Sequence, residues 1–393
     1  MFPIRALFLL KLADQGLFWY KHTMPTVSLS LNERSYHIHV ENGALERVGE
    51  LAYRAGMSGK MAVIADTNTA ALYGDHVLHS FDSAGFTVSM HIIPAGEASK
   101  SMSMAEELCS ELVKAGIDRS GNIAALGGGV VGDLAGFVSA IYYRGLPFMQ
   151  IPTTIVAQTD SSVGGKTAIN IAEGKNLVGA FHQPKVVVVD PTTLVTLDNR
   201  IISEGLAEAV KHAAIRDATM LPKLKELGNE LPLGFSLNTI QTLPELMARN
   251  IAIKARIVEE DEKETHDVRA LLNFGHTIGH GIEASRPYGE ILHGEAVALG
   301  MRAALYISSR KTKLTHKDSH KILATLKALN LPLMLPKNVD PSTVLEKIAT
   351  DKKFQSGKIR FVLLSALGEA FVSDDVTMED IKDAITELQH PVS

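Results

Sequence analysis

The sequence is poor in cysteine, in positive charge and in long apolar runs. Cys109 is the single cysteine in 393 residues, so no internal disulfide can form and a reducing cytoplasm is the expected location. The formal net charge of −5 lacks the basic excess that nucleic acids attract, so we expect no nucleic-acid partner. No apolar run approaches the roughly 18 residues of a membrane span, so we also expect no membrane partner. Internal repeats and low-complexity linkers are absent as well.

What remains is the composition of a globular enzyme. Apolar residues make up 46% and charged residues 21% of the chain, which is typical of soluble globular proteins. The length exceeds that of one ordinary hydrophobic core, so we expect two domains. The first residues faintly suggest a signal peptide, but Lys11 and Asp14 follow the apolar stretch and no small-residue cleavage site is present. We therefore expect residues 1–23 to be an extension outside the fold.

Short apolar segments alternate with amphipathic ones between residues 24 and 197. Strand-like composition, bounded by Gly, Pro or Asp, occurs in YHIHV, KMAVIAD, FTVSMHII, NIAAL, FMQIP and KVVVVD. The stretch SMSMAEELCSELVKAG has a helical period and ends at Gly116, a typical C-cap. This alternation predicts an α/β domain with a Rossmann-like, mostly parallel sheet covered by helices.

After Leu197 the apolar spacing becomes helical. It does so in ISEGLAEAVKHAAIRD, TLPELMARNIAIKARIVEEDEKE, GHTIGHGIEA, HGEAVALGMRAALYISSR and DSHKILATLKAL. The stretch KIRFVLLSALGEAFV predicts a terminal hairpin, and the acidic run EEDEKE predicts a solvated loop. We therefore predict a mainly α-helical domain over residues 198–393, with the active site in the cleft between the two domains.

A glycine loop follows the strand NIAAL. Gly127, Gly129 and Gly132 are in G-x-G-x-x-G register between this strand and a helix. Glycines at these positions let the backbone approach a pyrophosphate at the helix N-terminus. The loop departs from an ordinary Rossmann opening, because at least three strands precede it and no ribose-binding carboxylate follows at the usual offset.

Polar clusters follow two further strands. Asp66 and Asn68 end KMAVIAD, and Glu97 and Lys100 lie in the same topological position one strand later. Open α/β sheets bind ligands at the carboxyl ends of their strands. Three such clusters at three strand ends predict one dinucleotide across the sheet edge.

Three histidines indicate a metal site. His276 and His280 are spaced i, i+4 and share one helix face, and His293 follows shortly after. Zinc binds imidazole nitrogen and carboxylate oxygen, and a catalytic site keeps a position open. Glu208 is the carboxylate candidate, with Lys211 three residues later on the same face. Spacing alone does not distinguish His276 from His280 as the ligand.

The stretch DSSVGGKTAIN ends like a nucleotide-binding P-loop, because Gly165, Lys166 and Thr167 match its last positions. Its opening position is Asp160, and a carboxylate cannot replace the glycine that lets backbone N–H groups wrap a phosphate. Lys166 is therefore a candidate for a different phosphate. Further cations suited to a substrate with both a phosphate and a carboxylate are Lys175, Lys211, Lys254, Arg269 and Lys353.

Six motifs, in their order along the chain, resemble those of the 3-dehydroquinate synthase family. They are GGGVVGDLAGF, IPTTIVAQTDSSVGGKTAIN, GKNLVGAFHQP, AEAVKH, LNFGHTIGH and HGEAVALGM, and the likeness runs from about Met24 to the C-terminus. The resemblance implies a phosphorus–oxygen lyase that uses NAD and Zn²⁺ or Co²⁺. It would convert 3-deoxy-D-arabino-heptulosonate 7-phosphate into 3-dehydroquinate and phosphate, in the shikimate pathway of aromatic amino acid biosynthesis. Transient oxidation, phosphate elimination, reduction, ring opening and aldol closure would follow one another without net redox change.

The resemblance also implies roles for individual residues. The metal ligands would be Glu208, His276 and His293. The phosphate would contact Lys166, Asn176 and Lys211, with Arg144 reaching in from the second subunit of a homodimer. The carboxylate and ring hydroxyls would contact Lys254, Arg269, Asn273, His280 and Lys353. NAD would contact Asp66, Asn68, Glu97, Lys100, Gly129, Val130, Val131, Gly132, Asp133, Thr153, Thr154, Asp160, Lys166, Lys175, Thr193, Leu194, Val195 and Thr196.

Two departures and three alternatives remain. The segment between Lys254 and Arg269 is one residue longer than the family pattern, and residues 1–23 have no counterpart in it. One alternative is another sugar-phosphate cyclase, such as one that makes a deoxy-inosose or a valiolone; Arg269 with Lys353 favours a substrate that carries a carboxylate. A second alternative is a metal- and NAD-dependent polyol dehydrogenase, whose neutral substrate needs no lysine cluster. A third is a non-catalytic NAD- or metal-sensing module, which would have an incomplete site.

Overall fold

The chain folds into two compact units. The structure, a computed structural model, describes residues 25–287, 289–349 and 359–392. One unit contains the chain up to Leu197 together with Leu237–Glu259, and the other contains Asp198–Ser236 and the chain from Glu260 on. Among the described residues, no helix has both the length and the apolar character needed to cross a membrane. The expected extension, residues 1–23, lies outside the described residues.

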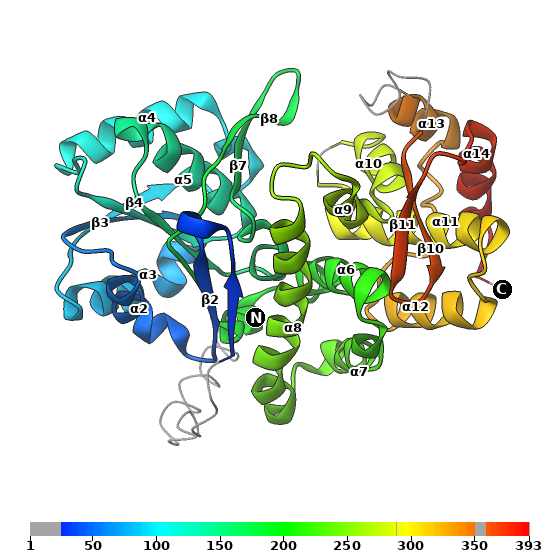
Figure 1. Cartoon of the computed structure of the whole chain (residues 1–393), viewed down its shortest axis with the longest axis horizontal. Helices are drawn as coiled ribbons and strands as arrows, with labels where there is room; N and C mark the ends of the chain where they lie inside the picture. The colour runs from blue at the N-terminus through cyan, green and yellow to red at the C-terminus, as the bar shows by residue number, and fades with distance from the viewer. Residues whose placement is uncertain (1–24, 288, 350–358, 393) are drawn as a thin grey trace. The chain divides into compact units, whose positions relative to one another are not determined.

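The first unit is built on a seven-stranded sheet in the order β1-β2-β9-β6-β5-β3-β4 (Figure 1). β1 is antiparallel to β2, and every other neighbouring pair is parallel. The strands are β1 (Thr26–Leu29), β2 (Tyr36–Val40), β3 (Lys60–Asp66), β4 (Thr87–Ile93), β5 (Asn122–Gly127), β6 (Phe148–Pro152) and β9 (Val186–Val189). β5, β6 and β9 are buried along their whole length, because helices cover both faces of the sheet. The predicted parallel sheet is confirmed.

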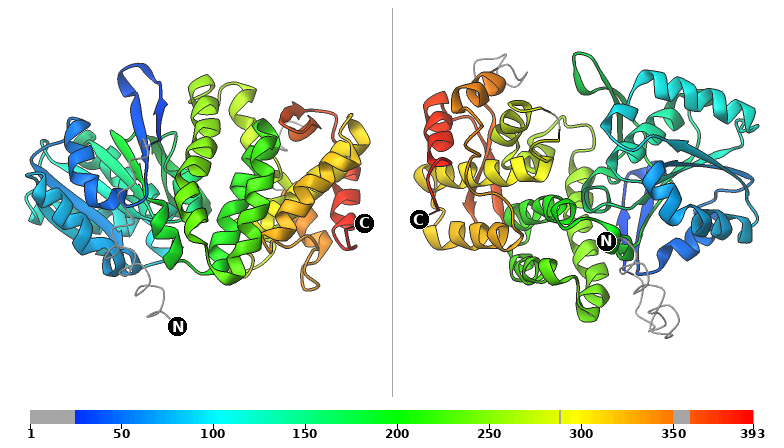
Figure 2. Two further views of the ribbon diagram at one scale, coloured as in Figure 1. Left: turned by 90° about the horizontal axis from the view of Figure 1, so that it is seen from below. Right: turned by 180° about the vertical axis from the view of Figure 1, so that it is seen from behind.

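Two helices pack on each face of this sheet (Figures 1 and 2). They are α2 (Val48–Arg54) and α3 (Thr67–Ser83) on one face, and α4 (Met102–Lys114) and α5 (Gly129–Ile141) on the other. Successive residues of β5 alternate between the two cores. Ala124 and Leu126 belong to the cluster on the α2–α3 side, whereas Ile123 and Ala125 belong to the cluster on the α4–α5 side, as strand geometry requires.

The GGKTAIN stretch forms part of a hairpin that the sequence pattern did not predict. Its strands are β7 (Lys166–Ile171) and β8 (Gly174–Phe181), which pair antiparallel. The backbone N–H of Asn170 donates to the carbonyl of Lys100 at 2.8 Å. The hairpin is therefore attached to the segment that follows β4.

Helix α8 (Leu237–Glu260) belongs to the first unit. The amide of Asn42, just after β2, donates to the carbonyl of Ile240 at 2.8 Å. This division differs from the expected boundary, which placed all of residues 198–393 in one helical domain. The apolar period of α8 predicts a helix, but the period does not say which unit covers its apolar face.

The second unit is mainly helical, as predicted. Its elements are α6 (Asn199–Arg216), α7 (Leu221–Glu230), α9 (Asp267–Ala270), α10 (His276–Ala284), α11 (His293–Lys311), α12 (His316–Ala328), α13 (Pro341–Ala349), β10 (Phe361–Ala366), β11 (Glu369–Ser373) and α14 (Met378–Glu387). α11 contacts α6, α10, α12, α14 and β10 and is the central helix of the unit (Figure 2). β10 and β11 form the predicted hairpin.

Candidate active site

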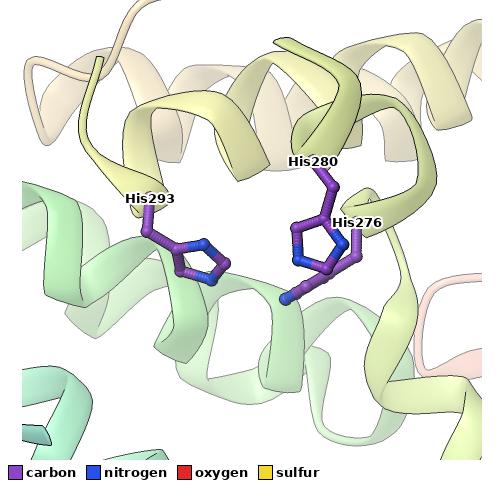
Figure 3. A group of neighbouring side chains, drawn as sticks. All are labelled: His276, His280 and His293. Atoms are coloured by element: carbon purple, nitrogen blue, oxygen red, sulfur yellow. The ribbon is translucent and has the colours of Figure 1, made fainter. Parts of the chain in front are cut away.

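Three histidines and a glutamate meet in the second unit. The rings of His276 and His280 project from α10 and the ring of His293 from the start of α11, and all three turn towards one another (Figure 3). One ligand nitrogen from each lies within 4.8 Å of the others. Glu208 Oε1, from α6, lies 3.4 Å from His276 Nε2 and 3.5 Å from His293 Nε2. Within the described residues, this buried oxygen has no hydrogen-bond partner.

The close packing of α10 on α11 depends on glycines between the histidines. Gly275 precedes α10 with φ +81°, a conformation that glycine adopts without strain. At Gly279, an added Cβ would lie 3.0 Å from the carbonyl oxygen of Ala296 on α11. Gly275 and Gly279 thus let α10 approach α11 closely, and this approach brings His276 close to His293.

The second ring nitrogens of two histidines have fixed partners. His276 Nδ1 lies 3.2 Å from the carbonyl oxygen of Phe274. His293 Nδ1 lies 3.1 Å from Glu283 Oε2. Because each partner is an acceptor, Nδ1 carries a proton, and Nε2 is the nitrogen left to offer a lone pair to a metal. His276, Glu208 and His293 therefore form a donor set suited to a divalent metal.

The charges of this cluster depend on burial and on Lys211, whose Nζ donates to Glu208 Oε2. Burial opposes ionisation of Glu208, but Lys211 and His276 outweigh it and hold the pKa of Glu208 well below its ordinary value. Burial lowers the pKa of His276 despite the nearby Glu208. Burial alone would also lower the pKa of His293, but the neighbouring carboxylates of Glu208 and Glu283 raise it to about 10. An ionised carboxylate and a neutral His276 are the forms that bind metal, whereas His293 has to release a proton.

Arg269 lies in the same unit on α9 and is 2% exposed. Its guanidinium donates to the carbonyl of Glu262, and Nε lies 3.5 Å from Glu264. The carboxylate of Asp261, which is 3% exposed, accepts the backbone N–H groups of Thr265 and His266, which precede α9, and of Arg269 on α9. The acidic run therefore contains a buried turn residue and is not simply a solvated loop. Asn273 lies in the short helix η9 (Leu271–Asn273), which packs against α6.

In the first unit, the expected NAD residues lie at the carboxyl edge of the sheet. Asp66 ends β3, Glu97 follows β4, Gly129 follows β5, Thr153 follows β6 and Thr193 follows β9. The chain passes from β3 to β4 on one side and from β5 to β6 on the other. The topological switch point, where open α/β sheets bind ligands, therefore lies between β3 and β5.

The glycine loop begins α5 at this switch point. Gly128 is the N-cap, and no side chain caps the helix there, so the first N–H groups of α5 suit an anion. At Gly132, an added Cβ would lie 2.7 Å from Gln150 Oε1 on β6. The last glycine of the motif is thus needed for close packing of helix on strand, as in the dinucleotide fingerprint.

A polar network around the buried Lys100 joins the glycine-loop helix to the hairpin. Lys100 is 4% exposed, and its Nζ lies 2.5 Å from Asp133 Oδ2 on α5 and donates to Asn176 Oδ1 on β8. Asn170 Nδ2 donates to Glu97 Oε1 at 2.8 Å. Burial raises the pKa of Asp133, although Lys100 opposes this rise. Four expected ligand-binding residues, all but Asn170, are therefore brought together within the first unit.

Gln158 links the loops that carry Thr153 and Thr193. It lies in a π-helical turn, η5 (Ala157–Ser161), and is fully buried. Its Nε2 donates to the carbonyl of Pro152 at 3.3 Å, the carbonyl of Asp190 at 3.0 Å and Thr193 Oγ1 at 3.0 Å. The sequence motif contains Gln158, but its role depends on contacts that spacing does not predict.

The remaining expected residues fall in different places. Lys254 Nζ forms an ion pair with Asp160 Oδ1 at 2.7 Å inside the first unit. Lys166 and Lys175 are exposed on the hairpin, and Arg144 is exposed with φ +72°. Lys353 lies outside the described residues.

Comparisons with known proteins identify the family. Two family models match the chain, 3-dehydroquinate synthase N-terminal over residues 90–204 and 3-dehydroquinate synthase C-terminal over residues 205–354. The 3-dehydroquinate synthase of Desulforamulus reducens is 41% identical over 358 residues, which cover 91% of this chain and 98% of that protein. The chain belongs to the 3-dehydroquinate synthase family.

Solved structures of related cyclases share the fold. The 2-epi-5-epi-valiolone synthase of Streptomyces hygroscopicus, with NAD⁺ and Zn²⁺ bound, has a TM-score of 0.80 and 27% identity over 91% of this chain and 98% of that one. A 2-deoxy-scyllo-inosose synthase, complexed with carbaglucose-6-phosphate, NAD⁺ and Co²⁺, has a TM-score of 0.81 and 25% identity over 92% of this chain and 99% of that one. The two-domain fold of the 3-dehydroquinate synthase family is thus common to cyclases with different products.

The sequence motifs of the 3-dehydroquinate synthase family do not draw attention to two carboxylates beside His293. They are Glu283, which contacts the ring, and Glu204, which accepts the N–H of Gly294 at 3.1 Å. The helical spacing of the sequence could have identified both carboxylates. Glu283 lies seven residues after His276, and Glu204 lies four residues before Glu208, so each shares a helix face with a candidate ligand.

Proposed function

We propose that this chain is a 3-dehydroquinate synthase that converts 3-deoxy-D-arabino-heptulosonate 7-phosphate into 3-dehydroquinate and phosphate. The observation that carries the proposal is Glu208 Oε1, a buried oxygen between the Nε2 atoms of His276 and His293 on a helix that also provides Lys211. Family membership supports the same function, because the chain aligns with 98% of a 3-dehydroquinate synthase at 41% identity.

The proposed metal ligands are Glu208, His276 and His293, with Zn²⁺ or Co²⁺ as the ion. The fit is supported by the donor set, since imidazole nitrogen and carboxylate oxygen suit both metals. The ion, when bound, supplies a Lewis acid that polarises a substrate hydroxyl. We propose that His280 is not a ligand. Its imidazole, exposed at the surface of α10, would instead bind substrate and accept or return a proton.

The proposed NAD site is the carboxyl edge of the sheet around the glycine loop. The cofactor supplies a hydride acceptor and donor, so one turnover leaves no net oxidation. Support comes from the uncapped N-terminus of α5 and from the residues gathered at the strand ends. The residues proposed to line it are Asp66, Asn68, Glu97, Lys100, Gly129, Val130, Val131, Gly132, Asp133, Thr153, Thr154, Asp160, Lys166, Lys175, Thr193, Leu194, Val195 and Thr196.

The proposed substrate residues form two sets, one for each charged end of the substrate. The phosphate would be bound by Lys166, Asn176 and Lys211, with Arg144 supplied by the second subunit of a homodimer. The carboxylate and hydroxyls would be bound by Lys254, Arg269, Asn273, His280 and Lys353. Charge-assisted bonds from fixed cations favour a dianionic group such as a phosphate. We further propose a cytoplasmic location, in keeping with a single, half-buried cysteine.

The main competing function is that of another sugar-phosphate cyclase. The structural neighbours of that kind are 25–27% identical to this chain, compared with 41% for the 3-dehydroquinate synthase relative. The buried guanidinium of Arg269 also favours a substrate with a carboxylate. A polyol dehydrogenase would not need the phosphate-binding lysines.

One assay tests the proposed function. Purified protein is incubated with NAD⁺, Co²⁺ or Zn²⁺ and the heptulosonate phosphate, while phosphate and 3-dehydroquinate are measured together. We expect both products in equal amounts and no net NADH. Steady accumulation of NADH would instead indicate a dehydrogenase. Turnover of a hexose 6-phosphate with no reaction of the heptulosonate phosphate would indicate a different cyclase.

A further inference from the structure

His293 is held from two sides by carboxylates that are not among the proposed metal ligands. On the side-chain side, Nδ1 lies 3.1 Å from Glu283 Oε2. On the backbone side, the N–H of the next residue, Gly294, donates to Glu204 Oε2 at 3.1 Å. The ring of His293 (Figure 3) and the first turn of α11 are therefore both anchored where His293 Nε2 lies 3.5 Å from Glu208 Oε1.

The two anchors come from the helices that carry the other two ligands. Glu283 lies on α10 with His276, two helical turns further along the same face, and Glu204 lies on α6 one turn before Glu208. The position of His293 is thus tied to both other ligands through helical backbone. These ties matter because His293 is the first residue of a helix that follows a loop, and its side chain is 35% exposed.

We infer that Glu283 is a positioning residue for the metal ligand His293, with Glu204 as its backbone counterpart. The inference rests on the metal site of the proposed function. Glu283 accepts the Nδ1 proton, which fixes the tautomer and leaves the Nε2 lone pair directed at the position beside Glu208 Oε1. Glu204 holds the start of α11 through the N–H of Gly294. The backbone of His293 is therefore already in place when a metal binds.

The inference is tested by metal affinity in the whole protein. Apo protein is titrated with Co²⁺ and Zn²⁺ against a competing chelator, and the visible spectrum of the Co²⁺ form reports the coordination geometry. We expect Glu283→Ala to bind both metals about 10- to 100-fold more weakly, the range for loss of a hydrogen bond behind a ligand, and to change the Co²⁺ spectrum. Glu283→Gln keeps an oxygen that accepts the Nδ1 proton, so we expect it to retain most of the affinity and the wild-type spectrum.

Glu295 provides a matched control at the same helix start. Its Oε2 accepts the N–H of Leu292 at 2.9 Å, and its Oε1 pairs with Arg200 at 2.6 Å. Glu295→Ala therefore also removes a carboxylate anchor from the beginning of α11. We expect its metal affinity to stay close to that of wild type, because its contacts are with Leu292 and Arg200 and not with a proposed ligand. Thermal melts of all variants show whether each is folded.

Each outcome distinguishes the inference from the proposed function. Wild-type metal affinity in Glu283→Ala would overturn the inference and leave the metal site intact. Equal losses in Glu283→Ala and Glu295→Ala would also overturn it, since general loosening of α11 would then explain both. Failure of the wild-type protein to bind either metal would overturn the proposed metal site itself, and the positioning role with it.

Discussion

Replacement of Gly132 by alanine tests whether the glycine loop is fixed by packing. An added Cβ would lie 2.7 Å from Gln150 Oε1 and 3.2 Å from its Nε2, and this amide donates to the carbonyl of Gly132 at 3.3 Å. Gln150 is 5% exposed, so it has little room to withdraw. Overpacking of this kind costs about 1–3 kcal/mol, and loss of the hydrogen bond costs about 1 kcal/mol. Alanine returns about 1 kcal/mol of helix propensity.

The net expectation for Gly132→Ala is a loss of about 1–3 kcal/mol in the free energy of unfolding. Gly74 in α3 is the matched control, because an added Cβ there would meet only Met90 Cε, the mobile end of a side chain, at 3.3 Å. Gly74→Ala should therefore gain up to about 1 kcal/mol from propensity. Urea unfolding followed by circular dichroism compares the two variants.

The same substitution should weaken the binding of NAD, because it displaces the helix whose first N–H groups would face the pyrophosphate. Titration calorimetry should show weaker NAD binding for Gly132→Ala and unchanged binding for Gly74→Ala. The double variant Gly132→Ala/Gln150→Ala removes the amide that the new Cβ would meet, so it should regain part of the lost stability. Equal stabilisation of both glycine variants would refute the packing argument, since the contact would then have relaxed without cost.

Four further predictions concern single side chains. Lys166→Ala should lower turnover by about two to three orders of magnitude, on the scale of one lost oxyanion donor, while ATP·Mg gives no thermal shift. Inactive Arg144→Ala and inactive His276→Ala, mixed under conditions of subunit exchange, should regain activity in an assay of phosphate release. His280→Ala should keep about one metal per subunit by metal analysis while turnover falls by roughly 10²–10⁴. Burial lowers the pKa of His182 in the folded protein. The unfolded chain therefore takes up a proton first as the pH falls below its pKa of about 6.5, and stability is lost. His182→Gln should reduce this loss, seen as a smaller fall of the urea midpoint between pH 7 and pH 5.

Each of these has a contrary outcome. A clear thermal shift with ATP·Mg would restore the P-loop interpretation of Lys166. No complementation despite measured subunit exchange would place Arg144 outside its partner's site. Metal-free His280→Ala, prepared where wild type is loaded, would make all three histidines ligands. An unchanged fall of the urea midpoint with pH in His182→Gln would mean that other groups cause the loss of stability in acid.

The sequence predicted the elements whose burial is uniform or periodic. The strand KVVVVD and the long helix HGEAVALGMRAALYISSR were both identifiable, because continuous burial and helical period each leave a clear signal. The hairpin β7–β8 was not, because its glycines and lysines interrupt the alternation and much of its surface is exposed. A local sequence pattern describes one element at a time. It therefore could not predict that α8 belongs to the first unit.

The candidate site was predictable where chemistry follows helical spacing. Glu208 with Lys211, and His276 with His280, were placed on shared faces by sequence alone, and the structure brings them together. Glu283 contacts His293, 10 positions away, and Gln158 contacts Thr193, 35 positions away, and no spacing rule specifies those partners. The family pattern named ligands, whereas the groups that orient them emerged only from hydrogen bonds.

The position of α8 has a consequence for synthesis of the chain. The polypeptide changes unit after Leu197, after Ser236 and again after Glu259, so neither unit is one continuous stretch. A nascent chain that has emerged only to Leu197 carries the whole sheet, but Asp160 still lacks the Lys254 ammonium with which it pairs. Native closure of the first unit must therefore wait until residue 259 has left the ribosome, by which time α6 and α7 are already exposed. A gene cut at residue 197 would yield a first fragment that lacks α8, and a second fragment that carries α8 without the rest of the first unit. Activity should therefore return only when both fragments are present together.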